Sequence, residues 1–275
     1  MSNILEKPGP LIMGILNVTP DSFSDGGRYI NTRDAVVRGL EMIEEGADII
    51  DIGGESTRPG SERVDAVEQK RRILDVISSL AKEIPKDVLI SVDTTLSDVA
   101  EAALDAGAGF VNDVTGGTDD ANLMRLVAER NVPYCIMHMQ GRPHNMQDNP
   151  TYDNAAKEVK TFLLEQASKA QSLGCEKENI ILDPGIGFGK LTQHNLELLR
   201  QLNQICDSEY SVLLGTSRKR FMGEICATED PAQRMPATCA TTALGVEAGA
   251  KIFRVHDVWQ NRQAADVSFA IKHSK

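Results

Sequence analysis

Eight short apolar runs recur along the chain, and each of them ends in a polar residue or a glycine. They cover Leu11–Asn17, Ala47–Gly54, Val88–Asp93, Gly109–Asp113, Pro133–Met139, Asn179–Gly185, Ser211–Ser217 and Lys251–His256. The segments between them carry apolar residues at three- and four-residue spacing, which is typical of amphipathic helices. Near-continuous apolar strands that alternate with helices predict a parallel sheet that is covered on both faces.

The number of strand–helix units favours a closed sheet. Eight strands make a barrel whose interior side chains can just fill it, so we predict a (β/α)8 TIM barrel with its active site at the C-terminal ends of the strands. A doubly wound open sheet shares the alternation and is the main alternative. The helices are expected from Thr32 to Gly46 and over Val67–Ala81, Leu96–Ala106, Asn122–Glu129, Ala155–Leu173, Gln193–Cys206, Pro231–Ala248 and Val258–His273.

Composition limits the class of protein. The net charge of −11 argues against nucleic acid or an anionic membrane as a partner. No apolar run approaches the roughly 18 residues of a membrane span, and the first ten residues lack the apolar centre of a signal peptide. The five cysteines are odd in number and scattered, as expected for reduced thiols. We therefore expect a cytoplasmic enzyme, and no change in composition marks a second domain.

Acidic and amide side chains end three of the runs, at Asp93, at Asn112 with Asp113, and at Asp183. Such carboxylates could bind a metal, act as a general base or accept hydrogen bonds. Histidines are few and no Asp-x-Asp pair occurs, so the edge of an amino-pyrimidinone ring is the better match. Asp183 and Asn112 would bind that edge, while Asp93 would accept a further ring N–H. A helix N-cap is the plain alternative for any one of them, and it suits Asp113 best.

Basic side chains end the last two runs. Arg254 and His256 are two residues apart in a strand, so they point the same way; each could be an ordinary surface residue, but together they resemble an anion clamp. Ser217 begins a basic stretch in the loop where barrels often bind phosphate, and Schiff-base chemistry at Lys219 stays open. The glycine-rich Asp183–Lys190 lacks the spacing of a P-loop, although its phenylalanine could form a wall for a flat ring.

These stretches together resemble the dihydropteroate synthase family. The motifs that carry the resemblance are Met13–Gly27, Asp51–Gly60, Ser91–Thr94, Asn112–Gly117, Asp183–Lys190, Thr216–Phe221 and Arg254–Val258, in the family's order. The resemblance implies one pterin-binding TIM-barrel domain over residues 1–275, usually as a homodimer. It implies a transferase that joins 4-aminobenzoate to (7,8-dihydropterin-6-yl)methyl diphosphate, giving 7,8-dihydropteroate for folate biosynthesis, with sulfonamides competing for the aminobenzoate position.

The resemblance also implies roles for single residues. The pterin would bind Asp93, Asn112, Met137, Asp183, Phe188 and Lys219; the diphosphate would bind Thr57, Arg254 and His256, with Mg²⁺ near Asn17; Phe23, Asp25, Arg58 and Pro59 would close over the site and bind aminobenzoate. Asp93, Lys219, Arg254 and His256 would be the catalytic residues. Arg220 stands where some members have serine, which concerns local contacts to the aminobenzoate carboxylate. No role is implied for Gln140–Tyr152.

Two other functions stay open at this point. A methyltetrahydrofolate-dependent methyltransferase would share the recognition of the ring edge by Asp and Asn, but it has no need of Arg254 and His256 as an anion clamp. A pterin-binding homologue without catalysis is the other. For the synthase, breaking the CH₂–O bond places charge on both fragments, so a dissociative, SN1-like path assisted by Mg²⁺ and the basic residues is expected.

Overall fold

The computed structural model describes residues 4–19, 32–56, 60–143 and 145–274. Eight parallel strands pair in sequence order, and β1 pairs with both β2 and β8, so the sheet closes into a barrel. The strands are β1 (Leu11–Asn17), β2 (Ile49–Gly53), β3 (Leu89–Asp93), β4 (Phe110–Asp113), β5 (Tyr134–Met137), β6 (Ile180–Asp183), β7 (Ser211–Leu214) and β8 (Ile252–Val255). The predicted TIM barrel is confirmed, and the open sheet is excluded.

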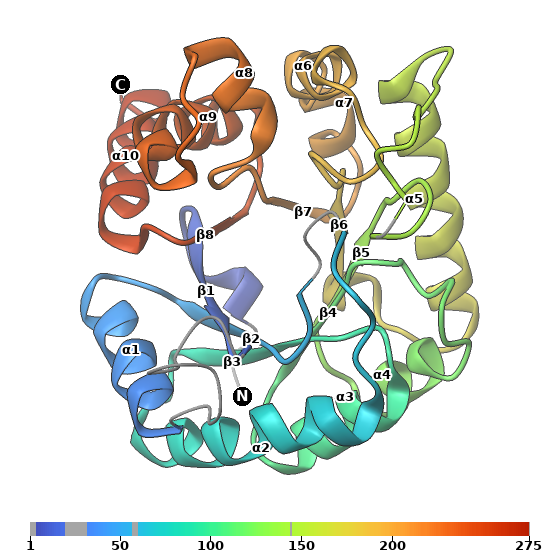
Figure 1. Cartoon of the computed structure of the whole chain (residues 1–275), viewed down its shortest axis with the longest axis vertical. Helices are drawn as coiled ribbons and strands as arrows, with labels where there is room; N and C mark the ends of the chain where they lie inside the picture. The colour runs from blue at the N-terminus through green and yellow to red at the C-terminus, as the bar shows by residue number, and fades with distance from the viewer. Residues whose placement is uncertain (1–3, 20–31, 57–59, 144, 275) are drawn as a thin grey trace.

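Helices surround the barrel, as Figure 1 shows. They are α1 (Thr32–Glu44), α2 (Ala66–Glu83), α3 (Ser97–Asp105), α4 (Leu123–Arg130), α5 (Ala155–Ser172), α6 (Thr192–Arg200), α7 (Asn203–Cys206), α8 (Arg220–Cys226), α9 (Met235–Ala248) and α10 (Val258–Lys272), with short 3-10 turns η1 (Ile4–Glu6), η2 (Lys177–Asn179) and η3 (Pro231–Arg234). The sixth predicted helix is divided into α6 and α7. In addition, α8 begins at the last residue of the basic stretch, Arg220, and was not predicted.

Helix ends follow ordinary capping chemistry. The side chain of Asp65 accepts from the Glu68 amide at the start of α2, and Asn154 does the same for Lys157 at the start of α5. Asn131 ends α4 in a left-handed conformation, with φ at 48°, which asparagine tolerates better than most residues. Among the described residues no helix has both the length and the apolar character needed to cross a membrane.

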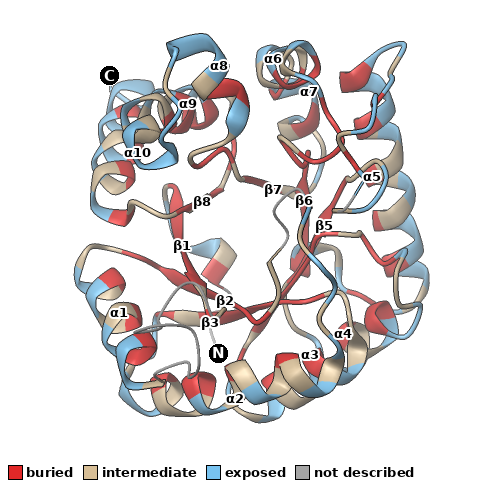
Figure 2. Ribbon diagram, in the orientation of Figure 1, coloured by how far each residue is buried: buried red, intermediate tan, exposed pale blue. Residues whose placement is uncertain are grey.

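Alternation along the strands divides the apolar side chains into two cores. Outward-facing residues such as Ile12, Ile50 and Val111 pack against the helices in one large cluster. Inward-facing residues fill the barrel and include Leu11, Met13, Ile49, Phe110, Cys135, Ile181, Leu213 and Ile252, with Ile4 below them. The strands are accordingly buried along almost their whole length, as the red segments in Figure 2 show. Each fully buried aliphatic side chain contributes about 1.5–3 kcal/mol to folding.

Candidate active site

The site is the next layer of inward-facing residues above the apolar side chains that fill the barrel. Two residues beyond the buried Ile49, Phe110, Cys135, Ile181 and Ile252 lie Asp51, Asn112, Met137, Asp183 and Arg254. Because side chains alternate along a strand, these residues face the barrel axis as well. Their layer is the floor of the mouth at the C-terminal ends of the strands, where TIM barrels carry their active sites.

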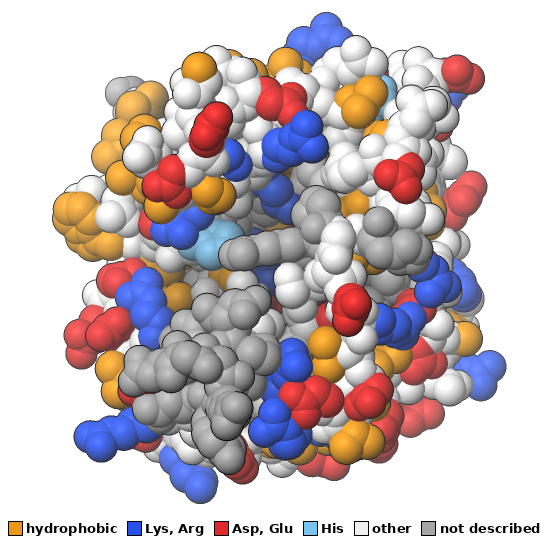
Figure 3. Space-filling model, viewed as in Figure 1, with side chains coloured by type: hydrophobic (Ala, Val, Ile, Leu, Met, Phe, Trp, Pro, Cys, Tyr) orange, Lys and Arg blue, Asp and Glu red, His pale blue; other side chains and the backbone are white. Residues whose placement is uncertain are grey.

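A cavity of about 800 Å³ opens at this mouth. Among the residues that line it are Asn17, Asn112, Met137, Asp183, Phe188, Lys219, Arg254 and His256. The structure therefore brings together eight residues that the sequence singled out. Asp93 lines a smaller neighbouring cavity of about 160 Å³ and reaches the main site through Arg254. Figure 3 shows a histidine and several basic side chains near the middle of this face.

Arg254 is held by two carboxylates at the floor of the site. Its Nε donates to Asp51 Oδ2 and its Nη2 donates to Asp93 Oδ2, both at 2.6 Å. Asp51 was not recognised in the sequence, because it lies inside an apolar run and its partner is 203 residues away. The expected clamp is thus modified, since the guanidinium is already committed to protein carboxylates through two of its three nitrogens.

Asp51 also orients the amide of Asn112. Asn112 Nδ2 donates to Asp51 Oδ2 at 3.1 Å, and Ser91 Oγ donates to Asp51 Oδ1 at 2.6 Å. With its Nδ2 so engaged, Asn112 keeps its amide oxygen as an acceptor for a ligand N–H. Asp51 therefore joins two residues of the site that the sequence places far apart.

Burial changes the acid–base properties of the remaining charged groups. It raises the pKa of Asp93 to about 7, although Arg254 acts in the opposite direction. It raises the pKa of Asp183 to about 6, against the hydrogen bond that Asp183 Oδ1 accepts from the Gly185 amide at 2.7 Å. Burial, with Arg254 nearby, lowers the pKa of Lys219 to about 8. The ammonium of Lys219 lies 3.9 Å from the ring centroid of Phe188, a favourable cation–π distance.

The loop after β7 contacts the residues that follow β8 through Ser217 and Arg218. Ser217 Oγ lies 2.9 Å from His256 Nδ1 and accepts from the His256 amide at 3.1 Å. This pairing favours Nδ1 as acceptor, with the ring proton on Nε2. Arg218 has a left-handed backbone, with φ at 58°, and its guanidinium donates to both oxygens of Asp257 at 3.0 and 2.6 Å. A non-glycine residue in that conformation is strained, and such strain concentrates at functional sites.

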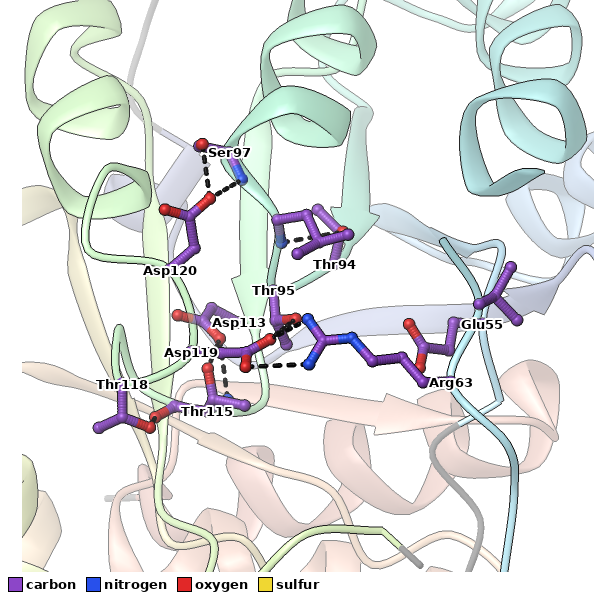
Figure 4. Close-up of polar contacts among 12 residues, drawn as sticks. Glu55, Arg63, Thr94, Thr95, Ser97, Asp113, Thr115, Thr118, Asp119 and Asp120 are labelled. Carbon is purple, nitrogen blue, oxygen red and sulfur yellow. Dashed lines mark hydrogen bonds and ion pairs between the residues drawn. The ribbon is translucent and has the colours of Figure 1, made fainter. Parts of the chain in front are cut away.

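The opposite side of the mouth carries a polar network. Arg63, from the loop after β2, donates to both oxygens of Asp119 at 3.1 and 2.6 Å. Thr95, from the loop after β3, donates to the same carboxylate at 2.8 Å. Figure 4 shows these side chains together, with Glu55 on the other side of Arg63. The network thus links the loops that follow β2, β3 and β4.

The structure corrects one interpretation and refines another. Asp113 is not a helix N-cap, because α4 begins only at Leu123; its carboxylate instead accepts from the Thr115 and Gly117 amides and from the Tyr134 hydroxyl. The structure also separates the three cations of the basic stretch after β7. Arg218 pairs with Asp257 and the exposed Arg220 pairs with Glu224 at 2.9 Å, whereas Lys219 interacts with the buried carboxylates Asp93 and Asp183.

Five predicted residues lie outside the described part of the chain. They are Phe23, Asp25, Thr57, Arg58 and Pro59. Residues that the sequence reasoning missed include Asp51, Ser217 as the partner of His256, and the buried Lys190. A charged residue inside an apolar strand was the signal for Asp51, and the end of the glycine-rich motif was the signal for Lys190.

Comparison with known proteins places the chain in one family. The family described as pterin binding enzyme matches residues 13–256. The dihydropteroate synthase of Bacillus subtilis is 44% identical over 265 residues, which cover 96% of this chain and 90% of that protein. The mitochondrial folate synthesis bifunctional protein of Pisum sativum is 44% identical over 96% of this chain, and the chain spans 54% of its length.

Solved structures agree. The dihydropteroate synthase of Xanthomonas albilineans, crystallised with 4-aminobenzoic acid, superimposes with a TM-score of 0.90 at 42% identity, over 98% of this chain and 95% of that one. The match therefore extends over nearly the whole chain. The chain belongs to the pterin binding enzyme family, among the dihydropteroate synthases, as its motifs predicted.

Proposed function

We propose that the chain catalyses the condensation of (7,8-dihydropterin-6-yl)methyl diphosphate with 4-aminobenzoate to give 7,8-dihydropteroate and diphosphate. The observation that carries this proposal is one cavity that is lined both by acceptors for a ring edge, Asn112 and Asp183, and by the donors Arg254 and His256. The family relationship supports the same reaction over a methyl transfer. As a transferase, the enzyme would supply a precursor of folate.

The pterin ring would bind edge-on to the floor. Asp183 uses Oδ1 for the Gly185 amide, so Oδ2 would accept the ring N–H groups, and the Asn112 amide oxygen would accept another. Met137 and Phe188, which belong to one small apolar cluster, would contact the ring faces. Asp93 would hold Arg254 beside the ring and support positive charge that develops on it.

The anionic end would meet the basic side of the mouth. Arg254 Nη1 is the guanidinium nitrogen outside the two carboxylate pairs, and we assign it to a diphosphate oxygen. His256 would donate from Nε2, since Nδ1 faces Ser217. Thr57 would add a hydroxyl, while Phe23, Asp25, Arg58 and Pro59 would enclose the aminobenzoate.

We assign Mg²⁺ as the cofactor of this reaction, since a divalent cation can neutralise a diphosphate leaving group. Asn17, at the end of β1 and at the edge of the cavity, offers one amide oxygen. That donor set fits Mg²⁺, which commonly takes one or two protein oxygens together with substrate phosphates and waters; the described residues include no group of three His, Cys, Asp or Glu side chains able to bind a metal. When bound, the ion would neutralise charge on the departing diphosphate.

The residues then act by placement and preformed charge. Arg254 and His256 would stabilise the leaving group as the CH₂–O bond breaks, and the arylamine would attack the resulting carbon without a strong base. Ordering two substrates in one cavity can supply at most about 7–11 kcal/mol of the barrier reduction. The proposed reaction therefore needs no covalent intermediate with a protein side chain.

The test is incubation with the dihydropterin diphosphate, 4-aminobenzoate and Mg²⁺. We expect diphosphate release that needs all three components and yields dihydropteroate. Release that continues without 4-aminobenzoate, or no release at all, would contradict the proposed reaction.

We also infer a homodimer formed through α9 and α10. These helices pack on each other and leave Leu244, Val267 and Ile271 60–66% exposed, and exposed apolar groups of this kind mark interaction sites. In sedimentation experiments Ile271→Asp should give monomers and the wild type dimers. A reducing cytoplasm would suit the five cysteines, none of which is in a disulfide.

A further inference from the structure

The loop after β6 presents three successive backbone carbonyl groups to side-chain donors. The pairs are Gln147 Nε2 with Gly187 O at 2.8 Å, Lys190 Nζ with Phe188 O at 2.9 Å, and Tyr152 Oη with Gly189 O at 2.8 Å. Two of the three donors come from the segment between β5 and α5, for which no role was expected.

Lys190 is the most buried of the three donors. It is 3% exposed, and besides the Phe188 carbonyl its Nζ lies 2.9 Å from His138 Nδ1 and 3.3 Å from the His138 carbonyl oxygen. An ammonium has three N–H donors, so this environment uses all of them. His138 itself packs edge-on against Phe162, with 5.0 Å between ring centroids. Lys190 thus fastens the end of the loop after β6 to the end of β5.

The loop after β6 lies in close contact with the residues that follow β5. Gly185 and Gly189 have positive φ angles of 64° and 60°, and a Cβ atom there would lie 1.9 Å from the His138 oxygen and 2.2 Å from the Gln140 oxygen. Only glycine avoids these overlaps. The two loops therefore pack backbone to backbone, and the three donors hold them in that arrangement.

Phe188 and Lys219 receive their positions from this arrangement. The Phe188 ring packs with Val114, Met137 and Met146, and it lies under the ammonium of Lys219. Gly187 leaves room for the lysine, since a Cβ atom there would lie 3.0 Å from Lys219 Cδ. A shift of the loop would move the ring wall and the lysine together.

We propose that Lys190, Gln147 and Tyr152 are positioning residues, which fix Phe188 and Lys219 for binding of the dihydropterin by holding the carbonyl groups of the loop after β6. The proposal rests on the proposed function, and it gives the segment between β5 and α5 a part in recognising the ring. Although Gln147 and Lys190 also line the cavity, the role proposed for them is exerted through the loop carbonyl groups that they hold.

The experiment is a double-mutant cycle with Lys190→Met and Phe188→Ala, read as KM for each substrate. Lys190→Met should raise KM for the dihydropterin diphosphate about tenfold and leave KM for 4-aminobenzoate within about twofold. In the Phe188→Ala background the same change should have almost no further effect on KM, because that variant lacks both the ring wall and the ring contact through which the loop positions Lys219. A purely structural role would instead give additive effects and a loss that both substrates share.

Tyr152→Phe is the second variant, since it removes one hydroxyl and keeps the ring between His138 and His194. It should raise KM for the dihydropterin diphosphate a few-fold, and this effect too should vanish with Phe188→Ala; it decides the question if Lys190→Met does not fold. The matched control is Tyr210→Phe, whose hydroxyl donates to Gln171 at an exposed position and whose loss should change neither KM. Additive cycles in an active enzyme would overturn this inference alone, whereas an inactive wild type would overturn the proposed function.

Discussion

Two ion-pair networks at the mouth of the barrel have the same short geometry and very different surroundings. At the floor, Arg254 pairs with Asp51 and Asp93 at 2.6 Å, and the Asp51 side chain is 0% exposed. At the rim, Arg63 pairs with Asp119 at 2.6 Å, but the Arg63 side chain is 50% exposed. From the N···O distances alone, the two networks would be expected to contribute equally to stability.

Solvent decides what each network contributes. Water screens the rim pair, and exposed pairs of this kind contribute about 0–1 kcal/mol. At the floor, removing one partner leaves a buried charge without compensation, which costs about 3–5 kcal/mol. The floor network should therefore control both folding and chemistry, whereas the rim network should only adjust how three loops lie.

The largest expected effect is that of Asp51→Asn. The substitution keeps the shape of the side chain but removes the charge that faces Arg254 and an acceptor for Asn112. We expect the free energy of unfolding to fall by about 3–5 kcal/mol in urea denaturation, with loss of turnover in the surviving folded enzyme. A fall of less than about 1 kcal/mol would mean that the floor pair is screened like the rim pair.

Next in size is the effect of Asp183→Asn on pterin binding. Asp183 is buried like Asp51 but accepts from a backbone amide instead of a cation, so its loss should affect the ligand more than the fold. A ring N–H left without its acceptor should weaken binding of a pterin without phosphates by about 1–3 kcal/mol in calorimetry. The control is Asp120→Asn. The Asp120 carboxylate accepts from the Ser97 amide and does not line the cavity, so this substitution should leave pterin affinity unchanged. Equal affinities for wild type and Asp183→Asn would remove Asp183 from the ring edge.

The sequence predicted the floor of the site better than its supports. The end of an apolar run marks the end of a strand, and the alternation of side chains along the strand tells which of the last residues face the barrel axis. This placed Asp93, Asn112, Asp183 and Arg254 at one mouth of the barrel, where the structure has them. Asp51 and Lys190 were missed because their partners lie 203 and 52 residues away, and local spacing carries no trace of such pairs. The division between α6 and α7 was not foreseen for a different reason, since the apolar spacing runs through both helices.

The two networks should also respond to pH with opposite signs. Burial raises the pKa of Asp93 from 3.8 to about 7, so the folded state holds this proton more tightly than the unfolded chain. Its contribution to stability is complete below about pH 4 and is lost as pH rises toward 7. Burial alone would raise the pKa of Asp119 too, but hydrogen bonds from Arg63 and Thr95 outweigh it and lower that pKa. Its contribution is complete above about pH 4 and is lost as pH falls further.

Unfolding free energies from pH 2 to pH 8 would check these signs. Asp93→Asn should flatten the decline between about pH 4 and 7, and Asp119→Asn should flatten the decline on the acid side of about pH 4. If Asp93→Asn left the shape of the curve unchanged, the Asp93 carboxyl group would titrate at the same pH in the folded and the unfolded chain. Water would then reach this carboxyl group in the folded protein.

The smallest effect is expected at the rim. Arg63→Met keeps much of the aliphatic stem but removes both hydrogen bonds to Asp119, while Thr95 continues to donate to that carboxylate. We expect a loss of about 0–1 kcal/mol in unfolding free energy at low salt, and none at about 1 M salt, where the Debye length is roughly 3 Å. Arg130→Met is the matched control, because Arg130 pairs with Asp105 and Glu101 at exposed positions away from the mouth. The two variants should be indistinguishable in stability at both salt concentrations. A loss above about 2 kcal/mol for Arg63→Met alone, persisting in high salt, would show that the ion pair at the rim is shielded from water. The two networks would then differ in where they lie and not in their exposure to solvent.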